Sequence, residues 1–391
     1  MSVATLPQTD WTQRADLAQL VAALGAENMR WVGGAVRDTL LGVEVNDVDA
    51  ATTLHPPEVM ERLEAAGIKP IPTGIDHGTV TAVLPEGNVE ITTLRKDVAT
   101  DGRRATVAFA EHWQDDAARR DFTINALFAH PETLEISDYF GGLGDLAARR
   151  VRFIGDARER IREDHLRILR YYRFQSRFGA ELDAEAEEAC AELAPMLKGL
   201  SRERIASELL ALLALPAPQE TLARMHRAGV LGVILPEAGE DTIAAHGQLL
   251  AHERAQGVAA APLRRLAALL PADPRLAEQV AARLRLSTKQ RVHLVRLAKR
   301  GGAPEGTPAL IYAEGPRVAE DLLLLDNAPV AGVADFTVPN FPLKGGTIVA
   351  RGVAAGPEVA RILQAVERRW VAEGFPDAAR VEALLDEALG S

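Results

Sequence analysis

One short segment, VGGAVRDTLLGVEVNDVDAAT at residues 32–52, constrains the fold of this chain most strongly. Its apolar lead-in from residue 29 predicts a strand, the glycine pair predicts a tight turn, and residues 35–41 predict a helix that ends at Gly42. Residues 47–51 then alternate between polar and apolar side chains, which predicts a second strand. This order of elements is much harder to attribute to chance than any one of its pieces.

The glycine turn and the helix after it are suited to binding a phosphate. Gly33 and Gly34 let the backbone come close to an anion, and the N–H groups that open the following helix can donate to its oxygens. Arg37 lies one turn into that helix, where its guanidinium could hold the same anion. The alternative is that the glycine pair is only a turn, and for the pair alone that is the commoner case.

The second strand carries two carboxylates on one side. Asp47 and Asp49 are two residues apart, so both point away from the face formed by Val48 and Ala50. In polymerase sites Mg²⁺ is usually held by one or two carboxylates together with substrate phosphate oxygens. The pair therefore predicts a magnesium site for phosphoryl transfer, and a solvated strand end is the alternative for Asp-x-Asp taken alone.

The next segment predicts a β-hairpin and then a polar loop. Residues 79–84 and 89–94 are rich in Thr, Val and Ile and flank the turn PEGN. Glu90 alternates with apolar neighbours, so it could reach the aspartate pair as a third carboxylate or equally be a surface residue. Residues 95–118 are polar and weakly periodic, which predicts that the segment includes a mobile loop with Arg103 and Arg104 near its tip.

The motif RRDFTINALF at residues 119–128 concentrates charge. Arg119 and Arg120 can neutralise a triphosphate. Asp121 can accept from a ribose hydroxyl or hold an arginine in place.

Beyond Arg150 strand signals nearly disappear, and the chain is predicted to be helical. A helix is expected over residues 157–178, on which Asp164 and Arg167 lie three apart and therefore on one face. Cytosine and adenine each place an amino donor beside a ring-nitrogen acceptor, whereas uracil and guanine place a carbonyl beside an N–H. A carboxylate with a guanidinium fits the first pair and mismatches the second. An ordinary surface salt bridge is the alternative.

Length and composition predict a soluble chain of several domains. The 391 residues are too many for one ordinary core. No apolar run approaches the roughly 20 residues of a membrane span, and the start lacks the pattern of a secretory signal. The single cysteine, Cys190, excludes intrachain disulfides and cysteine-rich zinc sites. Together these features favour the cytoplasm, and no segment points to a membrane or to a protein partner.

The net charge of -11 argues against a polyanionic partner, but its distribution does not. Residues 149–177 hold ten arginines against four acids, and residues 281–304 hold seven basic residues and no acids. These stretches suggest a directed anion-binding surface. For the second stretch alone, solvated helix faces are an equal alternative.

Taken in order, GGAVRD, NDVD, RRDFTINAL, EDHLRILR and SRERI resemble the class II tRNA nucleotidyltransferase and poly(A) polymerase family, most closely its bacterial CCA-adding members. The resemblance is specific over residues 30–235 and weaker beyond them. One departure is His165, where the family usually has proline.

The resemblance implies a fold and a site. The fold would be α+β, a polymerase-β-like nucleotidyltransferase head followed by all-helical parts: a head over residues 1–150, a neck with the base-recognition helix over 151–236, and an RNA-binding body and tail over 237–391. Asp47 and Asp49 would hold Mg²⁺. The nucleotide would be bound by Gly34, Arg37, Arg119, Arg120, Asp121, Asp164, Arg167, Arg170 and Arg173.

The implied reaction is attack by the 3′-hydroxyl of tRNA on the α-phosphate of CTP or ATP, with release of pyrophosphate. Three alternatives stay open: a bacterial poly(A) polymerase, a partial enzyme that adds only CC or only A, and a non-catalytic RNA-binding protein built on an inactive head.

Overall fold

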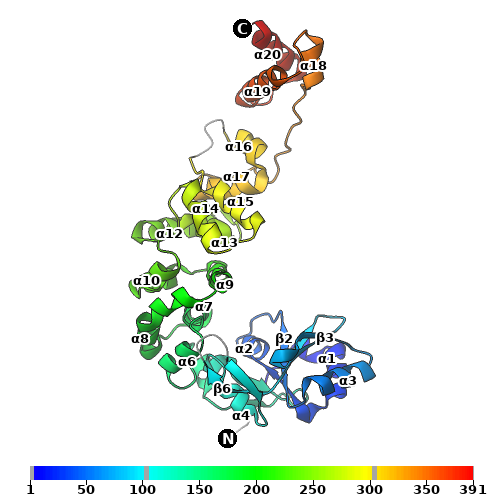
Figure 1. Cartoon of the computed structure of the whole chain (residues 1–391), viewed down its shortest axis with the longest axis vertical. Coiled ribbons are helices and arrows are strands. Elements are labelled where there is room, and N and C mark those ends of the chain that lie inside the picture. The colour runs from blue at the N-terminus through cyan, green and yellow to red at the C-terminus, as the bar shows by residue number, and fades with distance from the viewer. Residues whose placement is uncertain (1–3, 101–104, 302–305, 391) are drawn as a thin grey trace. The chain divides into compact units, whose positions relative to one another are not determined.

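The computed structural model describes residues 4–100, 105–301 and 306–390. The chain divides into two compact units, residues 1–236 and residues 237–391. In Figure 1 the first unit runs from blue to green and the second from yellow-green to red. The finer division of the first unit into a head and a neck at residue 150 stays a prediction.

A mixed sheet of seven strands forms the centre of the first part of the chain, in the order β3-β4-β5-β2-β1-β8-β9. Strands β2 and β5 run parallel, and the other neighbouring strands run antiparallel. The expected small mixed sheet is thus confirmed. The strands are β1 (Met29–Val32), β2 (Val48–Thr52), β3 (Lys69–Gly74), β4 (Thr79–Val83), β5 (Val89–Thr93), β8 (Leu127–Ala129) and β9 (Ile136–Asp138).

Short helices accompany this sheet, and their ends follow local signals. Helix α3 begins at a proline pair, where the missing N–H is no loss, and it ends just before Gly67, whose φ is +73°. Its buried residues Val59 and Leu63 are four apart, as one helical face requires. The helices of this part are η1 (Trp11–Gln13), α1 (Ala15–Leu24), η2 (Ala26–Asn28), α2 (Gly34–Leu40), α3 (Pro56–Ala65), η3 (Ile75–His77), α4 (Trp113–Ala118), η4 (Thr123–Asn125) and α5 (Gly142–Ala147).

Residues 95–118 hold more regular structure than their polar, weakly periodic sequence predicts. Strands β6 (Arg95–Thr100) and β7 (Ala105–Phe109) pair antiparallel as a separate two-stranded sheet, and α4 follows. Backbone hydrogen bonding from Arg95↔Phe109 to Thr100↔Ala105 defines these strands. The sequence lacks the regular polar and apolar alternation that would have predicted them. Arg103 and Arg104 lie outside the described residues.

The helix expected over residues 157–178 is two helices. Helix α6 (Ala157–Glu163) ends at Asp164, which is extended with φ -148°, and α7 (Arg167–Phe178) begins three residues later. The Asp164 carboxylate accepts from the backbone N–H of Leu166 at 3.1 Å, a local bond within the turn that separates the two helices. The prediction that Asp164 and Arg167 share one face of a continuous helix was therefore wrong.

The rest of the first unit is helical, as expected. It comprises α8 (Ala184–Leu193), η5 (Ala194–Gly199), α9 (Arg202–Leu213), α10 (Gln219–Arg227) and α11 (Val230–Ile234). Ser201 caps α9 by accepting from the N–H of Arg204.

The second unit is built from helices, and a buried ionic cluster joins three of them. Arg264 of α13 is 1% exposed and contacts Glu253 of α12 at 2.7 Å and Asp321 of α17 at 2.6 Å. The helices are α12 (Glu240–Gln256), α13 (Pro262–Ala268), α14 (Pro274–Arg283), α15 (Thr288–Leu297), α16 (Thr307–Glu314), α17 (Pro316–Leu325), α18 (Gly345–Ala350), α19 (Pro357–Ala372) and α20 (Ala378–Gly390).

The basic stretch of residues 281–304 is extensively paired within this unit. Arg283 contacts Glu237 at 2.6 Å, Arg291 contacts Glu278 at 3.1 Å, and Arg296 contacts Glu314 at 2.5 Å. These pairs favour the interpretation as helix faces over that of an anion-binding surface. No helix in the described ranges is both long and apolar enough to span a membrane.

Candidate active site

An open pocket of about 730 Å³ lies within the first unit. Every site residue proposed from the sequence lines it: Gly33, Gly34, Arg37, Asp47, Asp49, Glu90, Arg119, Arg120, Asp121, Asp164, Arg167, Arg170 and Arg173. Its walls come from segments as far apart in sequence as Val32 and Arg177, which sequence spacing alone could not establish.

The carboxylates gather where β2 and β5 run side by side. The register pairs Asp49 with Glu90, and Asp47 lies exposed just before β2 begins. Burial, together with the neighbouring Glu90 carboxylate, raises the pKa of Asp49 to about 6, although Arg120 acts in the opposite direction. An acidic group whose negative charge is this poorly compensated is suited to a divalent cation.

The site would rely on its substrate to complete the coordination of such a cation. Within the described part of the chain, no three acidic, histidine or cysteine side chains gather closely enough to hold a metal alone. Two carboxylates with substrate oxygens match the usual Mg²⁺ arrangement. Whether Glu90 is a ligand stays a prediction.

The glycine turn brings backbone and arginines together. Gly33 has φ +67°, a conformation that favours glycine, and a Cβ there would lie 3.4 Å from Nη1 of Arg120. Arg37 is 4% exposed, so its guanidinium has little freedom. It contacts Asp38 at 2.7 Å and stacks over the rings of Phe174 and Phe178 of α7, 5.1 and 4.6 Å from their centroids.

A buried aspartate orients the arginine pair at residues 119 and 120. Asp116 of α4 is 1% exposed and contacts Arg119 at 2.7 Å and Arg120 at 3.0 Å. Although burial acts against ionisation, these two guanidinium groups hold the pKa of Asp116 below its usual value. The arginines are thereby held on one side of the pocket.

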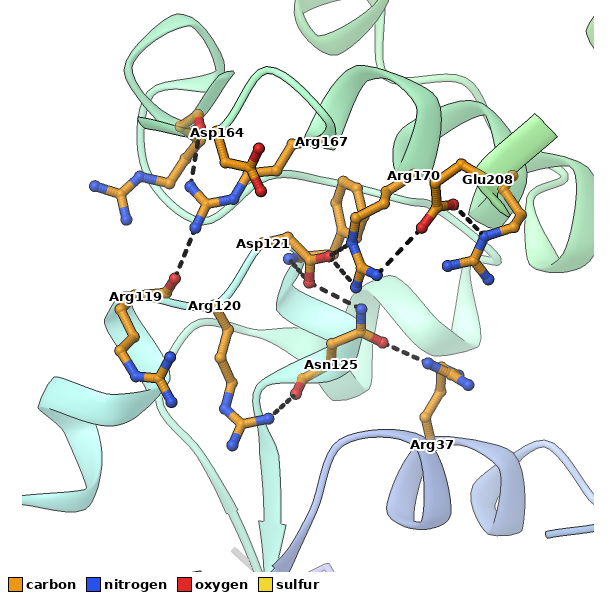
Figure 2. A network of polar contacts seen from close by, with 12 residues as sticks. Arg37, Arg119, Arg120, Asp121, Asn125, Asp164, Arg167, Arg170 and Glu208 are labelled. Carbon is orange, nitrogen blue, oxygen red and sulfur yellow. Dashed lines mark hydrogen bonds and ion pairs between the residues drawn. The ribbon is translucent and has the colours of Figure 1, made fainter. Parts of the chain in front are cut away.

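Asp121 holds an arginine in place, one of its two proposed roles. Its Oδ2 accepts from Nε of Arg170 at 2.7 Å, and its Oδ1 accepts from the Asn125 amide at 2.9 Å. Although burial acts against ionisation, Arg170 and these hydrogen bonds hold the pKa of Asp121 below its usual value. Arg170 and Arg173 both reach Glu208 of α9, at 3.7 and 2.6 Å, so the network in Figure 2 extends into the helical part of the unit.

The proposed base readers have partners other than each other. Nη1 of Arg167 donates to Glu163 at 2.5 Å, and its Nη2 donates to the carbonyl of Arg119 at 2.9 Å. Asp164 contacts Arg204 of α9 at 2.6 Å. The two residues thus line the same pocket from either side of a helix break, each oriented by its own partner.

Two family models match this chain. One, described as the poly A polymerase head domain, covers residues 29–152, and the other, described as a probable RNA and SrmB-binding site of polymerase A, covers residues 179–241. The mitochondrial CCA tRNA nucleotidyltransferase 1 of Mus musculus is 34% identical over 388 residues, which is 92% of this chain and 87% of that protein. The chain belongs to the tRNA nucleotidyltransferase and poly(A) polymerase family.

Other members of the family match closely too. The CCA-adding enzyme of Levilactobacillus brevis is 41% identical over 202 residues, 51% of this chain and 50% of that one. The solved CCA-adding enzyme of Bacillus stearothermophilus in complex with CTP superposes with a TM-score of 0.78 at 26% identity, over 97% of this chain and 99% of that one.

Sequence reasoning missed several residues that shape this family member's pocket. Arg177 and Asn125 line it, and Asp116 and Glu208 orient its arginines. Their spacing from the RRD motif could have identified two of these residues. Asp116 lies three and four residues before the arginine pair, and Asn125 lies four residues after Asp121. Glu208 carries no such local signal, because its partners are 35 or more residues away.

Proposed function

We propose that this chain is a CCA-adding enzyme, which adds C, C and A to the 3′ end of tRNA from CTP and ATP. The observation that carries the proposal is that the carboxylate pair, the arginines and the two base readers line one pocket. They do so in a chain that is similar over nine-tenths of its length to a CCA tRNA nucleotidyltransferase.

We propose that Asp47 and Asp49 hold Mg²⁺. The poorly compensated charge of Asp49 supports this assignment. The metal would supply activation of the attacking 3′-hydroxyl and stabilisation of the leaving pyrophosphate.

The protein's own part is positioning and charge neutralisation. Arg37, Arg119 and Arg120 would bind the triphosphate beside the Gly33-Gly34 turn, held ready by Asp38 and Asp116. Such preorientation lowers the entropy lost when the nucleotide binds.

The selection of cytosine and adenine would depend on the two residues at the break between α6 and α7. Asp164 can accept from the amino group that cytosine and adenine share, and Arg167 can donate to the adjacent ring nitrogen. The contacts to Glu163 and Arg204 would limit how far the two groups can move, so that both bases meet the same protein template.

A gel assay tests the proposal with a tRNA transcript that lacks its 3′ end, Mg²⁺, and CTP and ATP separately and together. Growth by three nucleotides only when both nucleotides are present is the expected result. A long ladder with ATP alone would identify a poly(A) polymerase, and growth limited to CC or to a final A would identify a partial enzyme. No extension would favour RNA binding without catalysis.

The location in the cytoplasm and the RNA-binding role of residues 237–391 stay proposals that rest on the sequence.

The requirement for Mg²⁺ can be tested in the same assay, where replacing Mg²⁺ with EDTA should abolish extension. Restoration by Mg²⁺ at millimolar concentration would support the choice of metal.

A further inference from the structure

The side-chain amide of Asn125 lies at the point where three parts of the pocket meet. It is 7% exposed and ends the single turn η4, just after the RRD motif. Its Oδ1 accepts from Nη1 of Arg37 at 2.5 Å, and its Nδ2 donates to Asp121 at 2.9 Å. Figure 2 shows this amide between the two side chains.

The chemistry of the neighbours fixes the orientation of this amide. A guanidinium can only donate, so the oxygen of the amide must face Arg37. Asp121 is ionised because Arg170 and hydrogen bonds hold its pKa low, so it can only accept and must face the NH₂ group. An uncharged group that both donates and accepts is required at this position.

The amide connects triphosphate binding to base reading. Arg37 belongs to α2, beside the glycine turn, whereas Asp121 holds Arg170, which lies three residues after the base reader Arg167 on α7. The backbone oxygen of Asn125 also accepts from Arg120 at 3.3 Å. A single residue therefore contacts an arginine of the GGAVRD motif, an arginine of the RRD motif and the aspartate that anchors α7.

We propose that Asn125 is a positioning residue that fixes Arg37 relative to α7, so that the triphosphate is held in register with the base readers. This inference rests on the proposed nucleotidyl transfer. Loss of the amide leaves Arg37 its contact to Asp38 and its packing on Phe174 and Phe178, so α2 and α7 stay in contact but their register is less well defined.

The test compares Asn125→Ala and the isosteric Asn125→Asp with Thr123→Val as the matched control. Thr123 belongs to the same turn and is 0% exposed. Its hydroxyl donates to the Asp145 carboxylate at 2.7 Å, and Asp145 contacts neither Arg37 nor Asp121 among the bonds described above. The measurements are the melting temperature, the KM for CTP, and the ratio of kcat/KM for CTP to that for UTP. The ratio is decisive because extra negative charge in Asn125→Asp would weaken both nucleotides equally.

We expect Asn125→Ala to raise the KM for CTP and to lower the CTP to UTP ratio by about tenfold each, as for loss of a hydrogen bond to a charged group. Asn125→Asp leaves no cavity and should lower the ratio at least as much, because its carboxylate faces Asp121. Thr123→Val should leave the ratio unchanged even if it melts earlier. A normal ratio in the folded Asn125→Asp protein, or an equal loss in Thr123→Val, would overturn the inference.

Failure of the proposed function gives a different result. If the wild-type protein extends no tRNA, the function is wrong. If the wild type extends tRNA with normal discrimination and both Asn125 variants do the same, only the positioning role is wrong.

Discussion

At the scale of single residues, buried partners hold several charged groups of the site in place. Asp116 orients two arginines and Asn125 bridges Arg37 and Asp121, whereas Asp49 lies beside another carboxylate. Its burial beside Glu90 disfavours its charged form, so the ionised Asp49 carboxylate opposes folding at the place where a cation would bind.

Asp49→Asn should therefore separate activity from stability. Above pH 6 the ionised carboxylate costs folding free energy of up to ~3 kcal/mol, and replacement by an amide removes this cost. We expect the variant to melt about 3–6 °C higher than wild type in EDTA at pH 7.5 while it loses at least about 1000-fold in nucleotide addition.

The difference in melting temperature should shrink as the pH falls from 6 towards 4, because the folded chain then binds a proton at Asp49 while the unfolded chain, with the ordinary carboxyl pKa of 3.8, still does not. Asp47→Asn is the matched control. Asp47 is exposed, so this variant should lose activity without a gain in stability. A lower melting temperature for Asp49→Asn, or retained activity, would refute the assignment.

At the scale of elements, the break between α6 and α7 decides how base selection can work. Asp164 lines the pocket and its Oδ1 also accepts from the N–H of Leu166, just before α7, so these two roles must be separated in any experiment. Its partner Arg204 is about half exposed, so their ion pair is worth little by itself.

Asp164→Asn keeps an oxygen that can accept from the N–H of Leu166 but removes the charge that favours an amino group of the base. We expect at least a tenfold loss of discrimination of CTP against UTP, with a melting temperature within about 2 °C of wild type. Steady-state kinetics with each nucleotide measure the first quantity. Arg204→Gln, which leaves Asp164 intact, should change the ratio less than threefold, and an equal effect of both variants would place the selectivity elsewhere.

At the scale of the whole molecule, the second unit contains a buried histidine that should make its folding sensitive to acid. In the second unit His246 of α12 is fully buried, and burial lowers its pKa to about 4. The unfolded chain binds a proton near pH 6.5, whereas the folded unit does not until about pH 4. Folding is therefore unaffected above pH 6.5 and is increasingly disfavoured between pH 6.5 and 4.

His246→Leu should remove this acid sensitivity. Relative to wild type, we expect the variant to gain ~2–3 kcal/mol of unfolding free energy for the second unit between pH 7.5 and pH 4.5. Urea unfolding at both pH values, followed by the fluorescence of Trp370 in that unit, measures the change. The same pH dependence in both proteins would show that other groups govern acid unfolding.

The sequence by itself determined the local elements and the chemical inventory of the site. The hairpin PEGN, the Gly33 turn and the Asp-x-Asp strand follow from short-range sterics and alternation, which act within a few residues. Family motifs, together with strand alternation for Glu90 and the position of Arg173 on the base-recognition helix, named all thirteen proposed site residues that the pocket contains. What each does in the reaction stays a prediction.

Tertiary structure alone decided which of these groups hold one another. Residue spacing placed Asp164 and Arg167 on one helix, yet the extended backbone of Asp164 ends α6 and α7 begins three residues later. The ladder between β6 and β7 and the contacts of Glu208 join residues without a local signal. Hydrogen bonds and burial depend on distance in space, and that distance is set only when the whole unit has packed.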